Sequence, residues 1–255
     1  MTVKNEVPAF SLFRSVGAHM KERYIFNFRM PPTELRKRLP APWIEPQVFS
    51  GFSVVSFCIL WLEQLRLPPL PRVGSFSTIS CAYRIGVVDT SDGSACPSVY
   101  VIDRWADLPL IALLGPFILQ DTIPIVKASV AHDNAGGTRV QMSYTDGSAL
   151  FEAGVTQRKQ PGLGSALFET VADFATFIKN GVSSYSPSLH PGQLTKVDLH
   201  KEDVDYEPLD AVVDFSELNT ESWAGAGLEF DSAVRAKTGG NYLWTYQGLW
   251  KTQTK

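Results

Sequence analysis

The chain has 255 residues, of which 44% are hydrophobic and 19% are charged. This composition is typical of a globular protein with a sizeable core, arranged as one large β-rich domain or two small ones. The formal net charge is −3 and no basic stripe occurs, so the composition excludes nucleic acid as an expected partner.

The first part of the chain predicts strands interrupted by one short helix. Aromatic and β-branched residues favour strands at 24–29, 49–64 and 98–103. Prolines open and close a short helix at 31–39.

A further long strand is predicted at 73–88. Its odd-numbered residues from Ser77 to Ile85 share one face, and its even-numbered residues from Phe76 to Arg84 share the other. Thr78 and Arg84 should therefore point to the same side of the sheet.

The rest of the chain predicts two helical segments among strands. One is a short helix at 110–119, broken at Gly115 and Pro116, and the other is a longer helix at 165–180 with an apolar stripe at helical spacing. Strands are expected at 124–132, 138–144, 149–155, 193–200, 211–215, 226–235 and 241–249.

Together these elements predict a mainly β (α+β) protein. Strands far outnumber helices and do not alternate with them, which favours antiparallel sheets curled into a closed cone or barrel. No stretch resembles a linker, so we expect a single domain over 1–255. The apolar runs are too short to span a bilayer and the three cysteines are unpatterned, so a cytoplasmic protein without a membrane partner is expected.

Motifs for several kinds of chemistry are missing from the sequence. It has no glycine-rich phosphate loop, no Gly-x-Ser-x-Gly elbow, and four isolated histidines without metal-ligand spacing. Neither a metal nor a cofactor is therefore expected.

Lys127 is the only lysine or arginine between Arg104 and Arg139, in a segment that is almost wholly apolar. A buried lysine loses the solvation of its charged form, so its pKa falls and its neutral amine becomes a nucleophile toward carbonyls. Alternatively, Lys127 lies at a strand edge and extends its ammonium group to water.

Four stretches, in order, resemble the acetoacetate decarboxylase-like superfamily, and most closely its uncharacterised bacterial branch. They span most of the chain: 23–43, 73–88, 99–127 and 168–200. The resemblance implies a cone-shaped fold around a central pocket for a carbonyl compound. It also implies self-association.

The sequence departs from that superfamily at the residues that carry decarboxylation. The decarboxylases have two adjacent lysines after a proline, whereas here Pro124 is followed by Ile125, Val126 and a single Lys127. The position of a family glutamate falls near Thr78, and that of a family arginine falls near Lys21 or Arg23. Decarboxylation of acetoacetate itself is therefore not expected.

The favoured hypothesis is a lyase-like enzyme or a cyclase that acts on a keto acid or polyketide-like compound in an apolar cavity. Lys127 would be the nucleophile or base, and Arg84 or Arg104 would hold a carboxylate or enolate. Thr78 and Asp103 are further candidates for substrate binding. Alternatively, Arg84 is a surface residue, Asp103 and Arg104 form a local turn or ion pair, and Thr78 is an ordinary strand residue.

Two other functions are possible for the whole protein: a non-catalytic small-molecule binder, or a structural protein without a ligand.

Overall fold

A large mixed sheet dominates the fold. In the computed structural model, the described part of the chain comprises residues 6–7, 14–68, 76–134, 136–220, 223 and 225–253. Within it the sheet has 14 strands, accompanied by α1 (Pro32–Arg36), α2 (Pro109–Ile118), α3 (Val171–Asn180) and a short 3₁₀ helix at Glu217–Asn219. None of these helices is long and apolar enough to cross a bilayer.

The strands follow one another with few interruptions. Their bounds are β1 (Glu6–Val7), β2 (Ser15–Met30), β3 (Ile44–Pro46), β4 (Ser53–Arg66), β5 (Thr78–Asp89), β6 (Cys96–Ala106), β7 (Val126–His132), β8 (Thr138–Tyr144), β9 (Ala149–Gln157), β10 (Ser183–Pro187), β11 (Gln193–Lys201), β12 (Tyr206–Ser216), β13 (Glu229–Ala236) and β14 (Gly240–Lys251). The predicted strand at 73–88 thus begins at Thr78, and its first residues, 73–75, lie outside the described residues.

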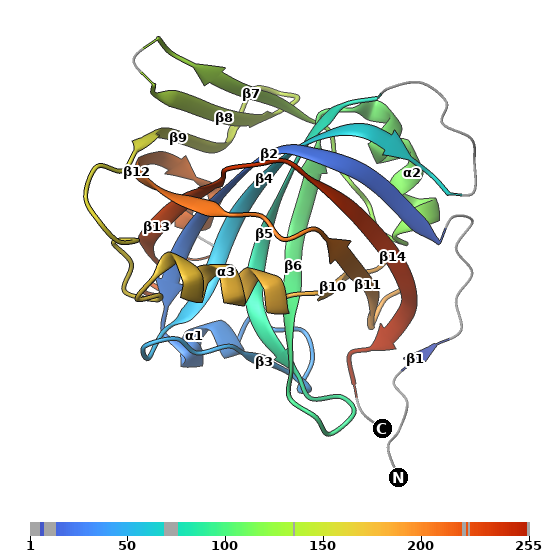
Figure 1. Cartoon of the computed structure of the whole chain (residues 1–255). Helices are drawn as coiled ribbons and strands as arrows, with labels where there is room; N and C mark the ends of the chain where they lie inside the picture. Colours follow the sequence, from blue (N-terminus) through green and yellow to red (C-terminus); the bar gives the residue numbers. More distant parts are fainter. Residues whose placement is uncertain are drawn as a thin grey trace.

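The sheet curls round because β14 pairs with β11 on one side and with β2 on the other. The order is β1-β14-β11-β10-β6-β5-β4-β2-β13-β12-β9-β8-β7, and β14 also pairs with β2. Gly240 lies opposite Met20 in that extra pairing, and Thr245 lies opposite Ser15. A ring therefore forms from β2, β4, β5, β6, β10, β11 and β14 (Figure 1).

The mainly β class and the curled sheet are confirmed, with one correction to the predicted pairing. β10 runs parallel to β6, with Ser184 opposite Val99 and Tyr185 opposite Tyr100. The segment between these strands contains α2, β7, β8, β9 and α3, and this long crossover gives the chain room to return in the same direction.

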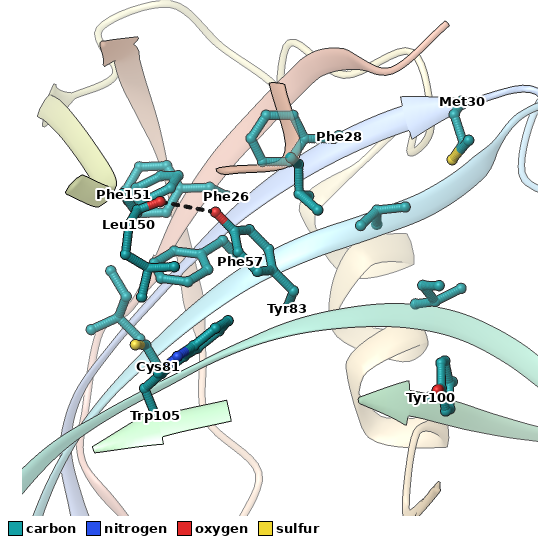
Figure 2. Close-up of a cluster of buried hydrophobic side chains, with 14 of the residues drawn as sticks. Phe26, Phe28, Met30, Phe57, Cys81, Tyr83, Tyr100, Trp105, Leu150 and Phe151 are labelled. Carbon is teal, nitrogen blue, oxygen red and sulfur yellow. Dashed lines mark hydrogen bonds between the residues drawn. The ribbon is translucent and has the colours of Figure 1, made fainter. Parts of the chain in front are cut away.

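An aromatic core packs on one face of the sheet (Figure 2). The rings of Phe57 and Phe151 stack with centroids 4.3 Å apart, and Phe26 lies 4.8 Å from Phe151. The Tyr83 hydroxyl donates to the Leu150 carbonyl at 3.3 Å, so this polar atom is satisfied within the core. These contacts join the first half of the sheet to its far end.

The other face of β4 and β5 is covered in part by α3, which crosses in front of them in Figure 1. A side chain at Gly86 would meet Phe177 of α3 and Val54 of β4, each at 2.8 Å. The glycine therefore allows the helix to approach the sheet closely.

The helix predicted at 165–180 begins later, at Val171. Thr170 accepts from the backbone N–H of Asp173 at 3.1 Å, and the Asp173 carboxylate accepts from the Thr170 N–H at 3.0 Å. This capping box fixes the first turn. Ser165, upstream, instead bonds the carboxylate of Asp231.

Candidate functional site

A cavity of about 290 Å³ lies within the ring of strands. Each strand of that ring supplies lining residues, and α2 and the turn after α3 add more. The walls are mostly apolar, with side chains such as Leu60, Leu62, Val101, Leu114, Leu199 and Trp244. A space of this size and character suits a small or medium organic molecule.

Three arginines supply the charge in the lining: Arg66, Arg84 and Arg104. Thr78, Ser80 and Ser184 add hydroxyl groups. The Thr78 hydroxyl already donates to the Asp107 carboxylate at 2.8 Å, so it supports the strand as well as lining the cavity. The cavity is therefore an apolar chamber with a positively charged wall.

Arg84, like Arg66, is a cation of this wall that has no counter-ion among the described residues. It lies on β5 between Ala82 and Gly86, on the face that the alternation predicts. Its Nε is buried and finds no hydrogen-bond acceptor among the described residues. A buried charged donor without an acceptor is unfavourable, so an anionic group on a ligand would satisfy it.

Arg104 differs because it has an acidic neighbour. Its Nε lies 3.3 Å from the Asp121 carboxylate, and both side chains are largely buried. Burial lowers the pKa of Arg104, Asp121 opposes that effect, and Arg84 adds to it by charge repulsion. Of these two neighbouring arginines, only Arg104 thus has a carboxylate partner among the described residues.

A cluster of polar side chains, buried except for the half-buried Lys201, lies beside the cavity and next to Arg84. We call it the inner cluster, and it consists of Arg23, Cys58, Lys201, Tyr206 and Tyr242. The Arg23 guanidinium donates to the hydroxyls of Tyr206 and Tyr242 at 3.2 Å each and to the Cys58 sulfur at 3.4 Å. The strands bring these residues next to the lining, because Arg23 pairs with Leu60 and Cys58 pairs with Ala82.

The charges of this region shift the pKa values of two groups. Burial acts to raise the pKa of Cys58, but the positive charges of Arg84 and Arg23 outweigh it and leave the pKa below its usual value. Burial, together with the same two arginines, lowers the pKa of Lys201 to about 7. Excess positive charge therefore favours a thiolate and a neutral amine here.

The structure separates the predicted site residues into two groups. Thr78, Arg84 and Arg104 come together in the cavity wall. Asp103 is exposed and is not part of the lining. A register shift in the β5–β6 pairing, between Tyr83 and Arg84, disturbs the alternation next to it.

Lys127 lies away from the cavity and is exposed at an edge strand, which agrees with the alternative interpretation and not with the expectation that it is buried. It sits on β7, the last strand in the sheet order, opposite Ser143. Its neighbour Val126 is buried and Lys127 is exposed, as strand alternation requires. Its position thus gives it no contact with a ligand in the cavity.

Sequence reasoning missed Arg66, Cys58 and Lys201 as polar groups of this region, and it considered Arg23 only through the family resemblance. A signal existed for Lys201. Val197 and Leu199 line the cavity, and strand alternation carries the same face to position 201. The predicted strand ended at His200, one residue too early to include this lysine.

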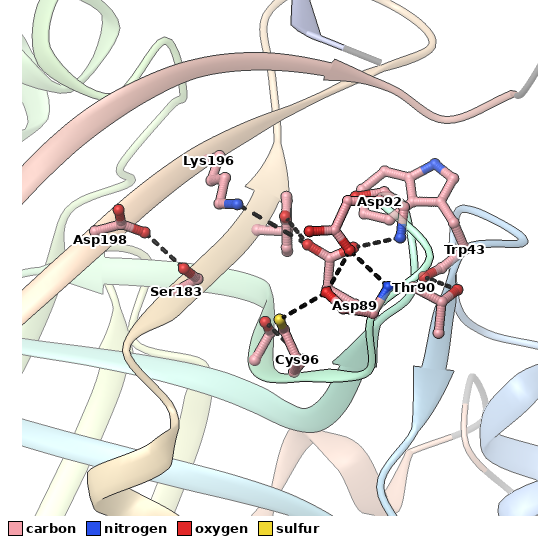
Figure 3. Close-up of polar contacts among 12 residues, drawn as sticks. Trp43, Asp89, Thr90, Asp92, Cys96, Ser183, Lys196 and Asp198 are labelled. Atoms are coloured by element: carbon pink, nitrogen blue, oxygen red, sulfur yellow. Dashed lines mark hydrogen bonds and ion pairs between the residues drawn. The ribbon is translucent and has the colours of Figure 1, made fainter. Parts of the chain in front are cut away.

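A second polar cluster, around Asp89, holds strands together (Figure 3). The Tyr185 hydroxyl donates to the Asp89 carboxylate, and the Lys196 amine lies 3.9 Å from it. Lys196 also lies over the rings of Tyr185 and Trp250. These contacts tie β5 to β10 and β11, so the cluster has a structural role. Within the described part of the chain, no group of three His, Cys, Asp or Glu side chains is placed to hold a metal ion.

No protein-family model and no curated protein matches the chain. Among solved structures, the acetoacetate decarboxylase from Legionella pneumophila subsp. pneumophila str. Philadelphia 1 is similar, with 14% identity, a TM-score of 0.61, and coverage of 99% of this chain and 95% of that one. An acetoacetate decarboxylase-like enzyme from Sphingomonas wittichii RW1 has 14% identity and a TM-score of 0.56, covering 97% and 95%.

A third similar structure is the enduracididine biosynthesis enzyme MppR, complexed with the condensation product of pyruvate and imidazole 4-carboxaldehyde. It has 14% identity and a TM-score of 0.56, covering 96% of this chain and 91% of that one. The protein therefore has the acetoacetate decarboxylase-like fold, and the resemblance seen in the sequence is confirmed at the level of the fold. Its closeness to the uncharacterised branch stays a prediction.

Proposed function

We propose that the protein is an enzyme that binds a carbonyl compound with an apolar body and a carboxylate or enolate head in the cavity, and converts it by lyase-like or cyclase chemistry. The observation that carries this proposal is Arg84, which lines a mostly apolar chamber and whose buried Nε has no acceptor among the described residues. The similar folds of enzymes described as acting on acetoacetate, or as binding a pyruvate condensation product, support it.

The chemistry would depend on electrostatic stabilisation by the arginine wall. Loss of carbon dioxide, a retro-aldol cleavage and a cyclisation each place negative charge on an enolate oxygen. A guanidinium held in an apolar site stabilises such charge more strongly than water does. No lysine occurs among the described lining residues, so the wall itself, rather than an amine in contact with the ligand, would supply this stabilisation.

Binding of octanoate, measured by isothermal titration calorimetry, tests the head-group assignment. Replacing the guanidinium in Arg84→Met should weaken binding by about ten- to a hundredfold, because a charged hydrogen bond is lost. Lys127→Met removes an exposed cation outside the cavity and should leave the affinity unchanged. Equal affinity of Arg84→Met and wild type would show that the carboxylate does not lie at Arg84.

Catalysis is tested with the β-keto analogue of octanoate. Nuclear magnetic resonance should show its conversion faster than the spontaneous reaction, and Arg84→Met should slow this conversion.

A non-catalytic binder is the second candidate. It is favoured by the absence of a lysine from the described lining and by the pairing of Arg104 with Asp121. Octanoate binding that depends on Arg84, without turnover of the β-keto analogue, would select this candidate.

A further inference from the structure

Lys201 is not itself in the lining, but it follows two lining residues on β11. Val197, Leu199 and Lys201 alternate along β11, and the first two line the cavity. Lys201 pairs with Tyr242 of β14, and Leu199 pairs with Trp244, which is also in the lining. The Lys201 amine donates to the carbonyl of Ile178 at the end of α3.

Burial has the largest effect on the pKa of Lys201, and two cationic and two acidic groups act on it as well. Arg23 from β2 and Arg84 from β5 repel its charged form, whereas Cys58 from β4 and Asp203 favour it. Asp203 forms an exposed ion pair with Lys179 at 2.6 Å, which weakens its effect on Lys201.

Two further neighbours of this region are tyrosines. The hydroxyls of Tyr206 on β12 and Tyr242 on β14 accept from Arg23. They are therefore neutral partners of the cation already in place.

We propose that Lys201 is a positioning residue for the anionic head of the ligand, and that its amine takes up a proton when a carboxylate binds at Arg84. This rests on the proposed function, since it requires a ligand carboxylate at Arg84, and it narrows the ligand to an anion in place of a neutral ketone. The carboxylate would place a negative charge beside the two arginines and the protonated lysine.

The direction of the effect follows from linkage. With a pKa of about 7 in the free protein, the amine is mostly neutral in mildly alkaline solution. A nearby carboxylate stabilises the ammonium form, so binding draws a proton from solvent, and by reciprocity added protons strengthen binding. The affinity for octanoate should fall as the pH rises above about 7, by at most tenfold for each pH unit.

Calorimetry of octanoate with the full chain, at about pH 8 in buffers of different ionisation enthalpy, measures the protons taken up per ligand. Wild type should take up more than about half a proton. Lys201→Met should still bind octanoate but take up almost none. Lys201→Arg keeps a permanent charge, so it should bind without uptake and with an affinity that changes little between about pH 7 and pH 9.

Two further variants test whether the proton uptake belongs to Lys201 or to a neighbouring group. Lys196→Met removes another lysine of β11, outside the inner cluster, and should leave the uptake unchanged. Cys58→Ala tests the thiol, whose lowered pKa a nearby anion would raise. Loss of the uptake in this variant, with retention in Lys201→Met, would assign the proton to Cys58 and overturn the proposal.

Other outcomes of the octanoate experiment separate a failure of the Lys201 proposal from a failure of the proposed function. Octanoate binding that depends on Arg84 but takes up no proton in wild type would refute the role of Lys201 and leave the proposed function standing. Failure of wild type to bind octanoate would overturn both. Octanol, a neutral probe of similar length, should bind without proton uptake, and uptake with octanol would contradict a response to the ligand charge.

Discussion

Replacing Lys201 by methionine should stabilise the free protein, and the gain should depend on pH. Met fills a similar volume in the inner cluster and brings no charge next to Arg23 and Arg84. In the wild type, burial and these two cations lower the pKa of Lys201 from 10.5 to about 7. The folded chain therefore holds this proton less tightly than the unfolded chain does.

The magnitude follows from linkage. A folded-state pKa below the unfolded value means that the unfolded chain binds more protons between about pH 7 and pH 10.5, so stability rises with pH in that window. At about 1.4 kcal/mol for each pH unit of separation, a charged Lys201 costs on the order of 3–5 kcal/mol below pH 7. Between about pH 6 and pH 9 the cost falls by about 2–3 kcal/mol.

Urea unfolding of wild type and Lys201→Met across this range measures the effect. The extra stability of the variant should be largest near about pH 6 and should shrink by about 2–3 kcal/mol by about pH 9. Lys127→Met, which removes an exposed lysine, controls for the loss of a lysine as such. Parallel stability curves for wild type and Lys201→Met would refute the reasoning, because they would mean that Lys201 titrates alike in the folded and unfolded chains.

Two further predictions concern how α3 is held. Gly86→Ala should destabilise the protein by about 1–3 kcal/mol in thermal denaturation, because the new methyl group would lie 2.8 Å from both Phe177 and Val54; an unchanged melting temperature would show that the helix is not closely packed there. Thr170→Ala should lower the free energy of unfolding in urea by about 1 kcal/mol, since it removes the acceptor for the Asp173 N–H. A variant as stable as wild type would contradict a structural role for this cap.

Strand alternation predicted the face of Arg84, and an apolar neighbourhood suggested burial of Lys127, for which exposure at a strand edge was the alternative. Alternation is a local property, so it correctly placed Thr78 and Arg84 on one face of β5. Alternation does not indicate which of the two faces of a strand lines a cavity. For β7 the apolar neighbours suggested burial, but the strand lies at the end of the sheet order, and its lysine faces outward.

The inner cluster could not be predicted from the sequence, for a different reason. Arg23, Cys58 and Lys201 lie far apart in sequence, and they meet only because β2 pairs with β4 and β11 pairs with β14. No local pattern encodes those pairings. The start of α3 was predicted too early, at 165, although Thr170 and Asp173 have the spacing of a capping box ahead of the apolar stripe and mark it locally.

The pairing of β14 with β2 sets the order in which a newly made chain can finish folding. Residues 15–20 find their partners about 220 positions later, a separation that makes loop closure slow and favours gradual assembly. A chain emerging from the ribosome thus carries an unpaired edge on β2 until its last strand has been synthesised. The compartment enclosed by the ring comes into existence at the final step, and a chain that stops short of β14 would lack it.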